Sequence, residues 1–168
     1  GKTIARYDKI HLFDVQVADG IGGYQESAVF EAGDALTVAK TPFGNIGLMV
    51  CYDLRFPELS LSLRNRGANI LTAPAAFTYT TGEMHWQLLL QARAMDSQCQ
   101  VLGAAQQGWH GEKRQTWGHT AATNSRGQIL EIVNQEGAQL ITVPFDLEEQ
   151  LKVRESMPLM QHRTLIQY

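Results

Sequence analysis

The stretch GNIGLMVCYDLRFPE, from Gly44 to Glu58, constrains the fold more than any other part of the sequence. Its first half is a nearly continuous apolar run ending at Val50, a pattern typical of a strand buried on both faces. Cys51 follows directly, and Pro57 with Glu58 then opens a helix, because proline suits the first turn and glutamate complements its positive end. The stretch therefore predicts a thiol at the carboxyl end of a buried strand, where α/β proteins place ligands and nucleophiles.

The pattern alone leaves two interpretations of Cys51. A buried cysteine is more often a small core residue than a nucleophile. Asp53 and Arg55 favour the nucleophile, because a core cysteine has no need of charged residues beside it. A cysteine–histidine protease fits the residue types, but no signature links Cys51 to a particular histidine. Cys99, in the segment SQCQVLGAA, is expected to be a packing residue, so we expect Cys51 to be reactive and Cys99 inert.

The order of the predicted elements indicates an α/β fold. Strands are expected over residues 36–39, 46–50, 69–73 and 100–105. Helices are expected over residues 57–66 and from a capping box at residues 80–83. This alternation predicts parallel or mixed strands with helices packed outside them.

The remaining segments predict further elements at both ends of the chain. Strands are expected over residues 3–7, 119–124, 128–133 and 139–145, and a last helix over residues 146–156. The strand at residues 3–7 has no preceding unit to pair with, so we expect the sequence to begin in the middle of a fold. All of it is assigned to one domain, residues 1–168.

Composition excludes several classes of function. The net charge of −3 and the lack of a basic block argue against a nucleic-acid partner, and no apolar run approaches the roughly 20 residues of a membrane helix. Two cysteines in 168 residues favour a reducing compartment, which we take to be the cytoplasm. The five histidines have no paired ligand spacing, so no metal site is predicted.

Three motifs resemble the nitrilase, or carbon–nitrogen hydrolase, superfamily: YDKIHLFD around Lys9, QESAVFEAGD around Glu26 and CYDLRFPE around Cys51. The resemblance extends along essentially the whole chain. Within the superfamily it is strongest to the Nit branch, in particular to amidases that hydrolyse deaminated glutathione. It implies the superfamily's α-β-β-α sandwich, here N-terminally incomplete, because the first βα units and a catalytic glutamate of the family would precede residue 1.

The resemblance implies the catalytic groups. Cys51 would be the nucleophile, Lys9 would stabilise the tetrahedral oxyanion together with the backbone N–H of Tyr52, and Glu26 would orient Lys9. A nearby ammonium and a helix N-terminus are expected to favour the thiolate of Cys51.

The resemblance also implies substrate contacts. Arg55 is a natural clamp for a substrate carboxylate, because its planar fork binds one bidentately. An ion pair with Asp53 or Glu58 is an equally weighted alternative. Phe77 and Thr81 match positions that line the pocket in the Nit branch, with ordinary packing and helix capping as the alternatives.

The implied function is hydrolysis of a small linear amide through a cysteine thioester, with no cofactor. The expected substrate is deaminated glutathione, giving 2-oxoglutarate and a dipeptide. The alternative is a catalytically inactive fragment that acts as a structural or interaction module. An unpaired sheet edge would favour a homo-oligomer, a dimer or higher, or pairing with a separate N-terminal chain. We therefore expect little amidase activity from this chain alone.

Overall fold

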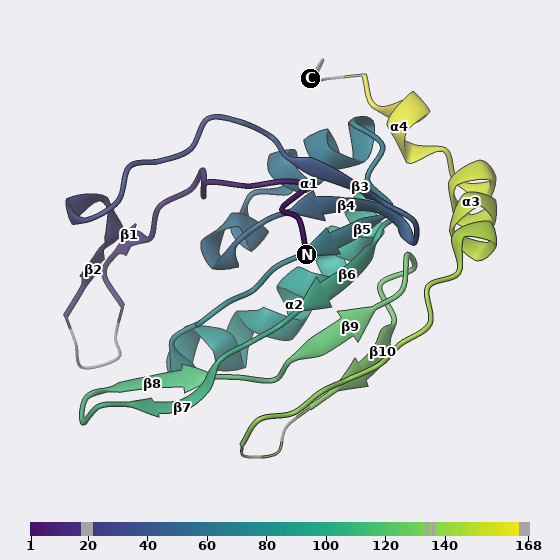
Figure 1. The fold of residues 1–168 in the computed structure, drawn as a ribbon. Coiled ribbons are helices and arrows are strands. Elements are labelled where there is room, and N and C mark those ends of the chain that lie inside the picture. Colours follow the sequence, from purple (N-terminus) through teal and green to yellow (C-terminus); the bar gives the residue numbers. More distant parts are fainter. Residues whose placement is uncertain (18–21, 134, 136, 165–168) are drawn as a thin grey trace.

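The computed structural model describes residues 1–17, 22–133, 135 and 137–164. In these residues a six-stranded mixed sheet has the strand order β10-β9-β6-β5-β4-β3 (Figure 1). Its strands are β3 (Val38–Thr41), β4 (Gly44–Leu48), β5 (Ile70–Thr72), β6 (Gln100–Gly103), β9 (Ala121–Thr123) and β10 (Ile129–Ile132). The three central strands β4, β5 and β6 run parallel, and the outer strands pair antiparallel. The predicted α/β class is confirmed.

Helices α1 (Pro57–Asn65) and α2 (Tyr79–Ser97) pack on one face of this sheet (Figure 1). The core lies between the helices and the sheet, and Trp86 and Leu90 of α2 are fully buried in it. A Cβ on Gly103 of β6 would come within 2.7 Å of the Trp86 ring, so the helix approaches the strand too closely for any larger residue there. No helix in the described part of the chain is long and apolar enough to cross a membrane.

The C-terminal helix α3 (Leu147–Ser156) lies beyond one end of the sheet strands and leads to the short α4 (Leu159–His162) (Figure 1). The side chain of Asp146 caps α3 by accepting from the N–H of Glu149 at 2.9 Å. The buried side chain of Gln150 donates to the carbonyl of Asn69 at 2.8 Å, which joins α3 to the start of β5. The predictions of a helix at residues 57–66 and at residues 146–156 are confirmed.

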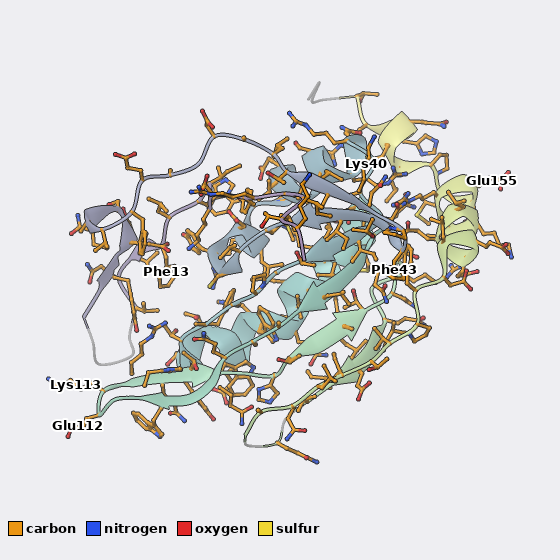
Figure 2. The ribbon with its side chains drawn as sticks, viewed as in Figure 1. Phe13, Lys40, Phe43, Glu112, Lys113 and Glu155 are labelled. Atoms are coloured by element: carbon orange, nitrogen blue, oxygen red, sulfur yellow. The ribbon has the colours of Figure 1, made fainter. Side chains whose placement is uncertain are left out.

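Two small hairpins extend from the same side of the molecule (Figure 1). One consists of β1 (Asp14–Val15) and β2 (Tyr24–Gln25), and the 3₁₀ helix η1 (Glu26–Ala28) follows it. The other consists of β7 (Gln107–His110) and β8 (Arg114–Trp117), and no strand was predicted at either position. Figure 2 shows Glu112 and Lys113 at the tip of the second hairpin, directed away from the rest of the molecule.

Three sequence predictions are wrong. Residues 3–7 and 139–145 form no strand, because neither segment makes a ladder of backbone hydrogen bonds with the strands of the described residues. Leu140 in the second segment is 91% exposed. The capping box expected at residues 80–83 is also wrong, since α2 begins at Tyr79 and its N-cap is Thr78, whose hydroxyl accepts from the N–H of Thr81.

Candidate active site

A cavity of about 1050 Å³ opens at the carboxyl ends of the parallel strands. It is lined by the residues that follow β4, β5 and β6, and by side chains from both hairpins. The structure brings all seven residues predicted for the site into the wall of this one cavity: Lys9, Glu26, Cys51, Tyr52, Arg55, Phe77 and Thr81. Such a position relative to the strands is where open α/β sheets bind their ligands.

Cys51 occupies a sharp turn between strand β4 and the 3₁₀ helix η2 (Cys51–Arg55). Its φ is +51°, a left-handed conformation that costs a non-glycine residue about 1–3 kcal/mol. The N–H of Cys51 donates to the carbonyl of Pro74 at 2.9 Å, which ties the turn to the end of β5. Strain of this kind accumulates at functional sites, where the surrounding structure holds the residue in place.

Burial raises the pKa of the Cys51 thiol above its ordinary value. A backbone hydrogen bond from Ala76 and the charge of Lys9 act in the opposite direction, while Glu26 raises the pKa further. Lys9 thus acts in the expected direction, towards the thiolate, but desolvation outweighs it and the net pKa is raised. The thiol therefore gives up its proton less readily than a free cysteine does.

Lys9 and Glu26 form a partly buried ion pair on the wall of the cavity. Lys9 Nζ lies 2.5 Å from Glu26 Oε2, and their side chains are only 13% and 25% exposed. The same carboxylate oxygen accepts from the backbone N–H of Phe13 at 2.7 Å. Figure 2 shows Phe13 beside the first hairpin, so this carboxylate joins the hairpin to the lysine segment. Because water is largely excluded, the pair is held more firmly than a surface ion pair.

Asp53 does not line the cavity, although it lies close to Cys51 in the sequence. Its carboxylate is fully buried and accepts from the Tyr7 hydroxyl at 2.8 Å. It also accepts from the backbone N–H of His11 at 3.2 Å and lies 2.8 Å from His11 Nδ1. Asp53 thus braces the segment that carries Lys9 against the turn that carries Cys51. The interpretation of Asp53 as a charged neighbour of the thiol is corrected by this position.

Arg55 has no carboxylate partner among the described residues. Its guanidinium lies 5.6 Å from the centre of the Phe77 ring, and its Nη atoms are 3.3 and 3.4 Å from Nδ1 of His85. The alternative of an ion pair with Asp53 or Glu58 is therefore not realised. The positive charge of Arg55 is available to an anionic ligand in the cavity.

Phe77 combines its two predicted roles, whereas Thr81 lines the cavity but does not cap the helix. Phe77 is 7% exposed and packs edge-on against the ring of Trp86 at 5.1 Å, so it belongs to the core as well as to the cavity wall. The hydroxyl of Thr81 lies 2.8 Å from that of the N-cap residue Thr78. Packing and pocket lining are thus compatible at Phe77, while the capping alternative for Thr81 is not realised because Thr78 is the N-cap.

The sequence analysis assigned no role to Arg114 and Tyr24, which also line the cavity. Arg114 comes from β8, and its guanidinium lies 6.0 Å from the centre of the Tyr24 ring on the other hairpin. A signal was present, because KRQTWGH places two basic residues before an alternating segment. Because the hairpin itself was not predicted, there was no reason in the sequence to place either residue near Cys51.

Three comparisons with known proteins show what this chain resembles. The sequence profile of the family described as carbon–nitrogen hydrolase matches residues 1–155. A deaminated glutathione amidase from Yersinia enterocolitica is 48% identical over 166 residues, which cover 99% of this chain and 58% of that protein. The crystal structure of the C. elegans NitFhit protein superposes with a TM-score of 0.85 at 40% identity, covering 96% of this chain and 39% of that one. The chain spans less than two thirds of the length of these relatives.

A further relative carries a covalent ligand. A variant of the amidase from Nesterenkonia sp. AN1 shows the acetamide moiety of fluoroacetamide added to its active-site cysteine. It is 26% identical to this chain, with a TM-score of 0.65, and the match covers 76% of this chain and 44% of that one.

Proposed function

Because this chain belongs to the carbon–nitrogen hydrolase family, we propose that it carries the nucleophile and the substrate clamp of an amidase. The proposed substrate is a small linear amide, deaminated glutathione, which is cleaved to 2-oxoglutarate and a dipeptide. The observation that supports this most is the arrangement of Cys51, the pair of Lys9 with Glu26, and the uncompensated charge of Arg55 around one cavity.

In the proposed reaction Cys51 first gives its proton to a base, and its Sγ attacks the amide carbon. Negative charge then develops on the carbonyl oxygen, where the ammonium of Lys9 and the N–H of Tyr52 stabilise it. The C–N bond breaks as the leaving amine takes the proton, and a thioester with Cys51 remains. Water hydrolyses the thioester and releases the acid. The covalent adduct on the active-site cysteine of the Nesterenkonia amidase supports this role for Cys51.

The base is proposed to come from outside residues 1–168. The raised pKa of Cys51 makes a base necessary, and Glu26 already accepts from Lys9 and from the N–H of Phe13. By resemblance to the family, this base is proposed to be a glutamate of a segment that would precede residue 1. The competing function is an inactive structural module. Such a module would show no amidase turnover even when the N-terminal segment is supplied.

Arg55 is proposed to hold the 2-oxo acid end of the substrate. It belongs to the same 3₁₀ helix as Cys51, so an acyl group held by the arginine would lie beside the thiol. A guanidinium binds a carboxylate through two parallel hydrogen bonds, which a lysine cannot reproduce. Arg55→Lys should therefore lose most of its kcat/KM on substrates that carry this carboxylate, and less on neutral amides.

The decisive assay uses the 168-residue chain with deaminated glutathione, with and without the N-terminal segment of the Yersinia relative added in trans. We expect little activity from the chain alone, because loss of a general base costs about 10²–10⁴-fold, and recovery when the segment is added. Cys51→Ala with the added segment is the matched control. Full activity without the segment would place the base inside this chain, and no activity with it would favour the inactive module.

A further inference from the structure

Arg114 lines the same cavity as Arg55 but comes from the second hairpin, far from Arg55 in the sequence. It is the first residue of β8, and its Nη2 donates to the carbonyl of Ala76 at 3.4 Å. The backbone of Ala76 in turn hydrogen-bonds the thiol of Cys51. Whereas Figure 2 shows the neighbouring Lys113 directed away from the molecule at the hairpin tip, Arg114 lines the cavity. The second hairpin thus brings one guanidinium into the cavity wall, next to the Ala76 backbone that contacts the thiol.

The guanidinium of Arg114 has unused hydrogen-bonding capacity. Its Nε is buried and has no hydrogen-bond partner. Among the described residues with a buried, unpaired side-chain nitrogen, Arg114 is the one that lines this cavity. Because this Nε has almost no exposed surface, a carboxylate in the cavity would bind the guanidinium through its Nη atoms, which carry more N–H donors than the one given to Ala76.

The charges around the cavity point to a ligand with two negative groups. Lys9 is neutralised by Glu26, but neither Arg55 nor Arg114 has a carboxylate partner among the described residues. Two uncompensated guanidiniums therefore face one cavity, although the chain as a whole carries a net charge of −3. A volume of about 1050 Å³ is enough for a ligand of tripeptide size.

We infer that Arg114 is a specificity-determining residue that binds the C-terminal carboxylate of the leaving peptide. The inference rests on the proposed function, because it concerns the same cavity and substrate. Deaminated glutathione carries one carboxylate on the acyl part and one on the leaving dipeptide. Arg55 holds the first and Arg114 the second, so the scissile amide lies between them beside Cys51.

The test is a binding measurement without turnover, by titration calorimetry on the Cys51→Ala chain. The two ligands are deaminated glutathione and the same compound with its C-terminal carboxylate converted to a carboxamide. We expect the carboxylate form to bind about 10-fold more tightly or better, as a charge-assisted hydrogen bond provides. Arg114→Gln should abolish that difference while leaving the carboxamide form unaffected, which also shows that the variant is folded. Arg114→Lys should keep part of the difference.

Arg55→Gln is the matched control, because Arg55 is assigned to the other end of the substrate. It should weaken both ligands by the same factor and preserve the preference for the C-terminal carboxylate. The inference is overturned if Arg114→Gln weakens the binding of both ligands equally. It is also overturned if Arg55→Gln is the variant that removes the preference for the C-terminal carboxylate. In either case the proposed function stands. If neither ligand binds the Cys51→Ala chain, the proposed function fails and the inference fails with it.

Discussion

The two cysteines of this chain have the same chemistry but lie in very different surroundings. Burial raises the pKa of both thiols, and in each case a nearby cation opposes that rise. Cys99 is fully buried, donates to the carbonyl of Ala68 at 3.3 Å and accepts from Arg154 at 3.4 Å. Cys51 lies in a strained turn on the wall of the cavity, with Lys9 near it.

The comparison shows that thiol acidity does not separate the proposed nucleophile Cys51 from the core residue Cys99. A cation beside the sulfur is common to both sites, so it cannot be the distinguishing feature. What differs is access to a cavity and the strained turn that holds Cys51 there. Cys99 has the cation without access, because its sulfur is enclosed among Ala68, Ser97 and Arg154.

Replacing each sulfur tests the comparison with the largest expected effect. In the chain assayed with the added N-terminal segment of the Yersinia relative, Cys51→Ser should lower kcat/KM by about 10⁴-fold or more, because the covalent step is lost. Cys99→Ser is the matched control and should leave kcat/KM within a few-fold. The measurement is amidase kinetics on deaminated glutathione. A comparable loss in both variants would mean that the difference between the two sites is not functional.

Removing each cation gives the next largest effect. Lys9→Met should lower kcat/KM by about 10²–10³-fold, because the oxyanion loses a donor. It should also raise the pKa of Cys51, since the charge of Lys9 lowers that pKa, so the pH profile of thiol alkylation should move to higher pH. Arg154→Met removes the cation beside Cys99 and should leave the Cys51 profile unchanged. Equal movement in both variants would contradict a local effect of Lys9.

Cys51 also differs from Cys99 in the buried carboxylate of Asp53, which joins the turn at Cys51 to Tyr7 and His11. Asp53→Asn should lower the free energy of unfolding by about 2–3 kcal/mol, because charge-assisted hydrogen bonds to Tyr7 and His11 are weakened. It should also lower kcat more than it raises KM, since Lys9 is no longer fixed against the turn. Asp96→Asn is the control: Asp96 pairs with Arg93 at 3.1 Å but is 44% exposed, so about 0–1 kcal/mol is expected. Urea unfolding measures both.

The structure separates what the sequence could predict from what it could not. The strand, the turn at Cys51 and the helix beginning at Pro57 follow from local signals, namely an apolar run and a proline at a first turn. The brace at Asp53 joins residues 46 positions apart in its bond to Tyr7, and no local pattern encodes such a contact. Arg114 was missed for the same reason, because its place depends on how a hairpin packs.

The failed strand at residues 139–145 shows the opposite limit. Its run of β-branched residues, Ile141, Thr142 and Val143, is typical of a strand, so the local prediction is reasonable. The described residues offer it no neighbouring strand, and Leu140 is left 91% exposed. Local propensity cannot supply the hydrogen-bonding partner that a strand requires.

The smallest expected effect is the pH dependence of stability. Both thiols have a folded-state pKa above the unfolded value of about 8.5, so the unfolded chain loses these protons first as pH rises. Their contribution is complete below about pH 8.5 and declines above it, by at most about 1.4 kcal/mol per pH unit and thiol. Cys99→Ser should show a shallower decline in urea unfolding above that pH. An identical slope in the variant would show that Cys99 does not titrate with folding.

The central claim is that Cys51 is the accessible, reactive thiol and Cys99 is not. The most direct measurement is alkylation of the folded 168-residue chain with iodoacetamide, followed over time by peptide mass spectrometry. The chain unfolded in urea, where both cysteines are exposed, provides the reference. We predict that Cys51 is carbamidomethylated well before Cys99 in the folded chain, and that the two react at similar rates in urea. Equal or faster modification of Cys99 in the folded chain would contradict the claim.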